Sequence, residues 1–488
     1  MLAVYPLVLK ALRGLPPDEY AQALRAPAWF TVVIGGALSL LALWALRVMA
    51  SSPGGAQVLV GLPGQGALLM ADAYTLWSCA ILGAALAVGA WVPAARRSLI
   101  RPSLLPFPII LLLTWLAQLM LCSLRVPVAL VCWLLILMGV GVVWYLLFRP
   151  RRQWQALEMP LVLLLAALLS TIGLLWLHRL SHGETLADAW VMLLSANPQA
   201  TNGAALLLVL GWLGPAIYLP WWLWTRRDEA SMLWLPAALV TVIAAQFALV
   251  HILYLAFPPA SDEIVKAAGI HPLFLIERTL GWMTAWGLLA LLAGSGWLAY
   301  VAVMRLQPTV ARLRPLALVA AGVLLIGISM GLQGQQQGGM HGLLWLQLAW
   351  ASMLCVWLAA GGMLTALAPT EQAERTTVQI ACWLSLLTLI AMPPGPGYRG
   401  LAALWEPMQT HSVPRALIVL TLVVAGMCAG AALPRWFAQQ TVPTPRPGAA
   451  WGILGPFLLA FVILLLGFFS LRLTPLLDMI GRSLLHTF

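Results

Sequence analysis

The stretch that decides the fold runs from Leu235 to Ala256 and has the sequence LPAALVTVIAAQFALVHILYLA. It contains no aspartate, glutamate, lysine or arginine. About 20 mainly apolar residues are what a helix needs to cross the hydrocarbon core of a bilayer. The stretch therefore predicts a transmembrane helix.

The same pattern recurs along the chain and predicts an all-α, polytopic transmembrane helix bundle of about 13 to 14 spans. Residues 1–27 are mildly amphipathic and predict an interfacial helix, which leads into a membrane domain over residues 28–488. The predicted spans are Ala28–Val48, Tyr74–Ala95, Leu104–Cys122, Val126–Phe148, Pro160–His178, Gly203–Trp224, Leu235–Ala256, Thr279–Met304, Pro315–Leu332, Gly342–Leu367, Thr376–Met392, Pro414–Trp436 and Trp451–Leu471.

Composition supports a lipid-facing surface. Of 488 residues, 62% are hydrophobic and only 8% are charged, whereas soluble proteins are about 25% charged. The longest polar stretches, near residues 50–73, 179–202 and 257–278, are too short to form a domain outside the membrane. The formal net charge of +11 fits basic loops that set topology, and no domain offers a surface for nucleic acid.

Soluble-enzyme motifs are absent: there is no phosphate loop, no GxGxxG after a strand, no nucleophile elbow and no HExxH. The six cysteines form no CxxC pair and no cluster with histidine, so they are interpreted as small buried hydrophobes, and neither a metal site nor a bound cofactor is predicted. Any function must come from polar groups within the membrane or from partner proteins.

Ionisable side chains inside a bilayer are functional candidates, because their burial is unfavourable. The proton-path candidates are Asp72, His178, Gln246 and His251. Alternatives stay open: Asp72, like Glu158 and Glu277, lies at a span end and fits a headgroup-level residue. His251 fits a satisfied interfacial histidine as well as a proton relay.

Prolines mark two interrupted spans, one at Pro215 and Pro220 and the other at Pro393 and Pro394. A proline inside a helix removes a backbone donor and frees a carbonyl. Two interrupted helices in separate halves of a chain point to an ion path in a transporter. For the second pair, an ordinary helix end at a proline loop stays open as the alternative.

Several segments, in order, resemble one family. They are LLMADAYTL at 68–76, GWLGPAIYLPWWLW at 211–224, RLRPLA at 312–317, VWLAAG at 356–361, PPGPGYRG at 393–400, and GFF at 467–469 followed by PLL at 475–477. They are similar to motifs of the antiporter-like membrane subunits (M/N type) of respiratory complex I, shared with Mrp-type cation–proton antiporters and membrane-bound hydrogenases. In the broken-helix motif of that family, Gly211, Pro220 and Trp224 match.

The resemblance implies inverted repeats with broken helices, and proton transport by a subunit of an NADH–quinone oxidoreductase-type or hydrogenase-like assembly. Such a subunit lies in the cell (inner) membrane beside other membrane subunits. It is at most a non-catalytic subunit, because quinone, NADH, flavin and iron–sulfur clusters are expected in its partners.

The chain departs from the family at its buried lysines. The family's broken-helix lysine falls on Pro215 and a later one on Met353, and the only lysines of the chain, Lys10 and Lys266, lie outside the predicted spans. Arginine does not release its proton at accessible pH and cannot replace them. We therefore expect a divergent subunit that is structural or uses a water-mediated path.

Two other function classes fit a membrane bundle. A stand-alone secondary transporter would bind substrate at the interrupted helices and work without partners. A membrane-embedded transferase acting on lipid-linked sugars is the weaker alternative, since its acidic outer loop would be the short segment with Asp262 and Glu263.

Overall fold

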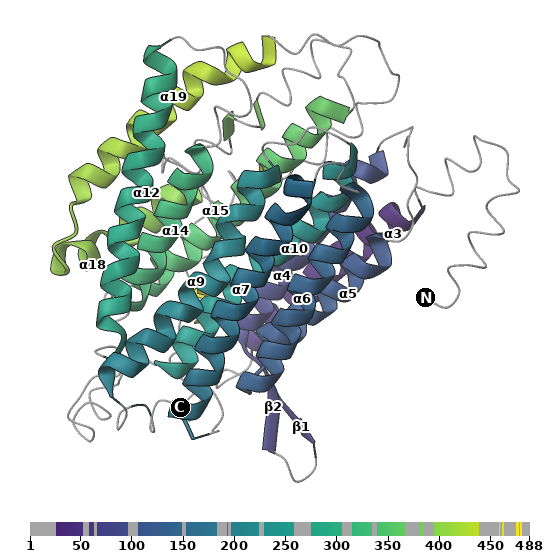
Figure 1. Ribbon diagram of the computed structural model, residues 1–488, viewed down its shortest axis with the longest axis vertical. Coiled ribbons are helices and arrows are strands. Elements are labelled where there is room, and N and C mark those ends of the chain that lie inside the picture. Colours follow the sequence, from purple (N-terminus) through teal and green to yellow (C-terminus); the bar gives the residue numbers. More distant parts are fainter. Residues whose placement is uncertain are drawn as a thin grey trace, which may run out of the picture.

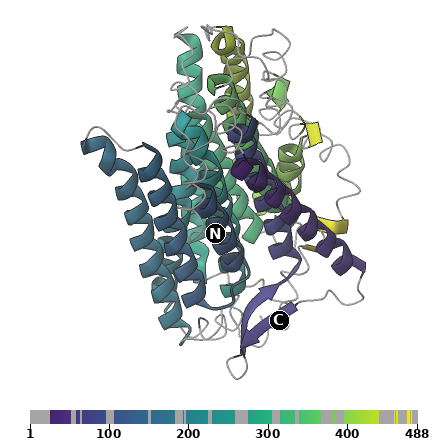
Figure 2. The same ribbon diagram turned by 90° about the vertical axis from the view of Figure 1, so that its right-hand side faces the viewer.

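The computed structural model describes residues 26–51, 58–62, 66–95, 106–148, 153–182, 197–223, 229–257, 275–304, 315–333, 339–366 and 395–438, with isolated residues between and after them. Over these ranges the chain forms a bundle of long helices with a β-hairpin projecting from one end (Figures 1 and 2). The predicted interfacial helix at 1–27, the spans Thr376–Met392 and Trp451–Leu471, and both lysines fall largely or wholly outside the described residues.

The long helices coincide with the predicted spans and often extend past them. Within the described residues, eight are long and apolar enough to cross a membrane. The helices are α3 (Ala26–Ser51), α4 (Ala73–Ala95), α5 (Pro106–Leu121), α6 (Val126–Phe148), α7 (Gln153–Leu180), α9 (Pro198–Leu223), α10 (Glu229–Ala256), α12 (Glu277–Val303), α14 (Pro315–Gln333), α15 (Gly339–Ala366) and α19 (Arg415–Ala438), with two short helices, α17 (Pro396–Ala403) and α18 (Trp405–Thr410). The multi-pass helical fold is thereby confirmed.

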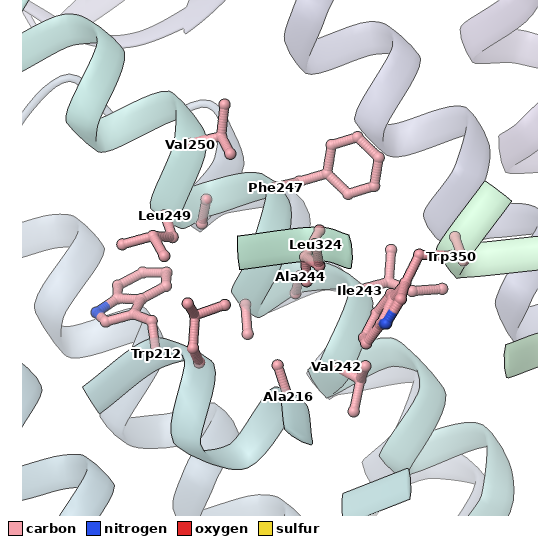
Figure 3. Close-up of a cluster of buried hydrophobic side chains, with 14 of the residues drawn as sticks. Trp212, Ala216, Val242, Ile243, Ala244, Phe247, Leu249, Val250, Leu324 and Trp350 are labelled. Carbon is pink, nitrogen blue, oxygen red and sulfur yellow. The ribbon is translucent and has the colours of Figure 1, made fainter. Parts of the chain in front are cut away.

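Helix α10, which contains the apolar stretch Leu235–Ala256, is the centre of the bundle. Every residue of its most apolar window is buried, and it packs against α4, α5, α6, α9 and α15. Figure 3 shows part of this packing, with Trp212 of α9 on one side and Trp350 of α15 on the other. A helix that is apolar all round belongs in the interior of a bundle, so its sequence explains its place.

The outer helices show one apolar face to lipid. On α3, for example, Leu40 and Trp44 are well exposed, while Leu46 is buried. At the inner faces, small residues bring helix backbones together, as they do in other membrane bundles. A Cβ atom built on Gly83 of α4 would lie 2.7 Å from the carbonyl oxygen of Gly35 in α3.

A β-hairpin lies between α3 and α4, where the sequence predicted only a polar loop. Strands β1 (Val58–Leu62) and β2 (Gly66–Ala71) pair antiparallel, with an irregularity between Val60 and Gly61. The amide of Met70 donates to the carbonyl of Cys122, 2.7 Å away, so the hairpin is tied to the segment that follows α5. Strand β2 therefore leads directly into the start of α4 at a fixed place.

The start of α12 is held by a side chain of another helix. The Oδ1 atom of Asn202, on α9, accepts from the backbone N–H of Thr279 at 3.0 Å, and its amide nitrogen donates to the carbonyl of Leu275 at 2.5 Å. The first turns of a helix have backbone N–H groups without partners inside the helix. Asn202 therefore caps α12 from outside.

We expect Asn202→Ala to lower the melting temperature of the detergent-purified protein. The change leaves the Thr279 amide without its acceptor, which costs about 1–3 kcal/mol for a buried donor. The exposed Gln199, on the first turn of α9, provides the control: Gln199→Ala should melt as the wild type does. Equal melting of both variants would contradict the capping role.

Candidate functional site

Asp72 caps α4 from inside the bundle. Its Oδ1 atom accepts from the backbone N–H of Thr75 at 2.7 Å, and its own N–H donates to Oγ1 of Thr75 at 2.9 Å. This reciprocal pair is a capping box, with threonine in the place usually held by glutamate or glutamine. Asp72 is completely buried, and its second oxygen, Oδ2, has no hydrogen-bond partner among protein groups.

Tyr74 joins α4 to two other helices. Its hydroxyl donates to the backbone carbonyl of Phe247 on α10 at 3.2 Å and accepts from Nε2 of Gln347 on α15 at 3.3 Å. Both side chains are fully buried. A buried polar group that is hydrogen-bonded in this way fixes the relative positions of its helices. Tyr74 therefore connects the capping site of Asp72 with α10 and α15.

His251 of α10 lies against Tyr74. The two ring centroids are 5.8 Å apart and the rings are inclined by 27°. The imidazole hydrogen-bonds the backbone of Leu121, the last residue of α5, and interacts electrostatically with Asp72. A carbonyl at a helix C-terminus has no partner within its own helix, so the imidazole caps α5. Its Nε2 atom is buried without a partner.

Asp72, Tyr74, His251 and Gln347 together form what we term the polar cluster. It lies in the part of the bundle next to the hairpin, because Asp72 follows β2, Leu121 ends α5 and His251 precedes the end of α10 by five residues. Among the aspartate, glutamate, lysine, arginine and histidine side chains that the structure describes, only Asp72 and His251 are buried. The bundle therefore places its two buried ionisable groups of these types together.

Several buried polar atoms on α4, α10 and α15, the helices that carry the cluster, have no partner among protein groups. They are Oε1 of Gln347, both amide atoms of Gln246, the hydroxyl of Tyr254, and the indole nitrogens of Trp77 and Trp350. Buried polar groups in proteins are almost always hydrogen-bonded, to protein or to ordered water. We therefore expect these atoms to form hydrogen bonds with water inside the bundle.

Of the four predicted proton-path residues, Asp72 and His251 lie together in the polar cluster. Asp72 is fully buried, whereas Glu158 and Glu277 are exposed, as residues at the headgroup level would be. Gln246 is buried on α10 but lies about 140° around the helix from His251. His178 lies half-buried in the last turn of α7, a helix that packs mainly on α6 and α9.

The interrupted helices take a different form from the one predicted. Pro215 and Pro220 lie inside α9, which is helical without a gap from Pro198 to Leu223. The interruption therefore consists of backbone donors missing from a continuous helix. Pro393 and Pro394 lie outside the described residues, and α17 begins just after them, at Pro396.

Sequence reasoning missed Tyr74 and Gln347. Both side chains are neutral, whereas ionisable groups are the ones whose burial in a bilayer marks them as functional candidates. A usable signal was present, because an uncharged polar side chain within a predicted span also has to find a partner.

No protein-family model and no curated protein sequence matches the chain. Solved structures do match it. One is a chain of the membrane-bound sulfane sulfur reductase, an archaeal respiratory membrane complex, with 14% identity, a TM-score of 0.70 and 96% of each chain covered. A chain of the Mrp complex from Dietzia sp. has 14% identity and a TM-score of 0.67, covering 96% of this chain and 94% of that one. A chain of respiratory complex I from Thermus thermophilus, with bound NADH, has 17% identity and a TM-score of 0.65, covering 95% and 99%.

The bundle and its buried polar cluster define a polytopic helical membrane protein. The comparisons define the fold further: over nearly its whole length the chain has the fold of chains from respiratory and Mrp complexes. The predicted resemblance to antiporter-like subunits is thereby confirmed at the level of the fold. The inverted repeats that the resemblance implies stay a prediction.

Proposed function

We propose that this chain is an antiporter-like membrane subunit of a multi-subunit respiratory or Mrp-type assembly, and that it conducts protons through the polar cluster. The observation that supports the proposal most directly is the meeting of Asp72 and His251 across Tyr74 inside the bundle. Structural similarity over 96% of the chain to membrane complexes supports assembly with other membrane subunits. In such an assembly, NADH, flavin, iron–sulfur and quinone chemistry belongs to the partners.

The geometry suggests a division of roles. Asp72, beside the hairpin, would take up a proton on Oδ2, since Oδ1 is engaged by the Thr75 amide. His251 would receive it on Nε2, which is buried without a protein partner, because one ring nitrogen of a neutral imidazole can accept a proton. Tyr74 would position both through its contacts with α10 and α15. Water bonded to the unpartnered Oε1 atom of Gln347 would extend the path into the bundle.

This path does not require the lysines that the family uses. An aspartate and a histidine are both able to exchange protons, whereas the positions that correspond to those lysines carry Pro215 and Met353. The proposed route is therefore short, depends on water and begins near one membrane face. A purely structural subunit is the competing outcome, and the following experiment separates the two.

His251→Gln should abolish most proton uptake by the native assembly in proteoliposomes. Glutamine keeps a donor for Leu121 but does not titrate, so the assembly should form while transport falls about 100-fold, the low end of what a positioned proton-transfer group contributes. His411, an exposed residue between α18 and α19, gives the control: His411→Gln should transport normally. Unchanged proton uptake in both variants would contradict the proposed path through His251 and support a purely structural subunit.

Purification from native membranes tests whether the chain assembles with other subunits. A tagged chain extracted from native membranes should bring other membrane subunits with it, identified by mass spectrometry. Recovery of the chain alone, with ion transport intact, would favour the stand-alone secondary transporter instead.

A further inference from the structure

Two free cysteines meet beside the polar cluster. Cys79 lies in the second turn of α4, and Cys122 is the first residue after α5. Their side chains are hydrogen-bonded to one another, and both interact electrostatically with Asp72. The two residues are far apart in sequence and form no CxxC motif, so no local pattern indicates the pair.

Backbone and side-chain bonds hold Cys122 in this position. The carbonyl of Cys122 accepts from the amide of Met70 at 2.7 Å, and its thiol is hydrogen-bonded to Thr75. The next residue, Ser123, forms a β-bridge with Leu69. The segment after α5 is thus attached to the hairpin and to the first turn of α4, which fixes the two sulfur atoms as neighbours.

The two cysteine side chains differ in their exposure. Cys79 is 9% exposed, whereas Cys122 is half-buried in the turn that follows α5. A small reagent arriving from the hairpin end would therefore meet Cys122 first. A metal site is a weaker interpretation, because no group of three or more histidine, cysteine, aspartate or glutamate side chains that could hold an ion occurs among the described residues.

We propose that Cys79 and Cys122 are a modification site, a dithiol that hydrogen peroxide or a related small hydroperoxide oxidises to a disulfide joining α4 to the end of α5. In such reactions the sulfur is the nucleophile, and its proton is lost as the new bond forms.

The reaction proceeds in two steps. In the first, the sulfur of Cys122 attacks one peroxide oxygen, the O–O bond breaks, and the released hydroxide takes the thiol proton, giving a sulfenic acid and water. In the second, the sulfur of Cys79 attacks the Cys122 sulfur, the S–O bond breaks, and the departing hydroxide takes the second thiol proton. Two thiols are thus oxidised by two electrons in total, and one peroxide is reduced to two water molecules.

The disulfide would act on the polar cluster through Leu121. This residue precedes Cys122, and its backbone is the partner of the His251 imidazole. A covalent link from Cys122 to Cys79 would restrict movement of the end of α5 against α4, and hence of the imidazole capping it. This consequence rests on the proposed proton path, whereas the disulfide itself does not.

The first experiment treats the full-length protein in nanodiscs with hydrogen peroxide, alkylates the remaining thiols after denaturation, and maps cysteines by mass spectrometry. We expect a Cys79–Cys122 linked peptide as the main product, reversed by dithiothreitol, with the other four cysteines of the sequence, Cys132, Cys355, Cys382 and Cys428, still alkylated. Cys132→Ser should leave the crosslink intact, and Cys122→Ser should abolish it. Failure of both thiols to oxidise, or a mixture of pairings, would overturn the proposal; the wild-type digest decides even if a variant does not fold.

The second experiment measures proton uptake by the assembly before oxidation, after it, and after reduction. Uptake should fall as the crosslink forms and return with dithiothreitol, while the Cys122→Ser assembly should be insensitive to peroxide. A crosslinked assembly with normal uptake would overturn the coupling to His251. If His251→Gln also transports normally, the proton path has failed instead, and the peptide map still decides on the disulfide.

Discussion

Replacing Gly211 by alanine is expected to lower the melting temperature of the purified protein sharply and to reduce the yield of monodisperse protein, whereas Gly214→Ala should change neither. Both glycines belong to α9, three residues apart. A Cβ atom on Gly211 would lie 2.5 Å from the backbone nitrogen of Ser170 in α7, while one on Gly214 would meet nothing within 4 Å. The two variants therefore make the same chemical change in very different surroundings.

The expected effect is large because backbone, and not a flexible side chain, would have to move. Ser170 accepts a hydrogen bond from the indole of Trp133 at 3.1 Å, and Trp133 stacks on Trp212 at 4.6 Å. Separating α9 from α7 disturbs this contact among three helices. Overpacking costs about 1–3 kcal/mol, and we expect the upper end of that range. Equal melting temperatures for both variants would show that α7 and α9 can move apart freely.

The contact at Gly211 also shows what the sequence could and could not predict. Apolar spans such as Val126–Phe148 were placed correctly, because a helix in lipid satisfies its own backbone and is identified by length and hydropathy alone. The hairpin Val58–Ala71 and the short helices α17 and α18 were not predicted, since none is a long apolar run. The continuity of α9 through Pro215 and Pro220 was not predicted either, because neighbouring helices determine whether a proline ends a helix.

The sequence predicted the ionisable residues of the candidate site but not the contacts that connect them. Asp72 and His251 were identified because burial of an ionisable group is unfavourable and calls for a partner. Their connection through Tyr74 and Gln347 depends on a hydrogen bond between residues 273 positions apart. No local pattern encodes such a distance. The thiol pair was missed for the same reason, since Cys79 and Cys122 approach one another only when α4 and α5 pack.

Asp72 gives the second large effect, because its two oxygen atoms can be tested separately. We expect Asp72→Asn to melt close to the wild type and to lose about 100-fold of proton uptake in the assembled complex. Asparagine is as good an N-cap as aspartate, so the bond to the Thr75 amide survives. It cannot take up a proton at neutral pH, so any relay through Oδ2 is lost.

Thr75→Ala is the matched counterpart. It removes the hydroxyl that accepts from the Asp72 amide at 2.9 Å but leaves the carboxylate in place, so stability should fall by about 1 kcal/mol while uptake persists. Asp72→Ala should show both defects, since it removes the cap and the charge. Thermal melting and proteoliposome uptake, measured on all three variants, would assign the cap to Oδ1 and the proton to Oδ2. Full uptake by Asp72→Asn would restrict Asp72 to capping and move the start of the path to His251.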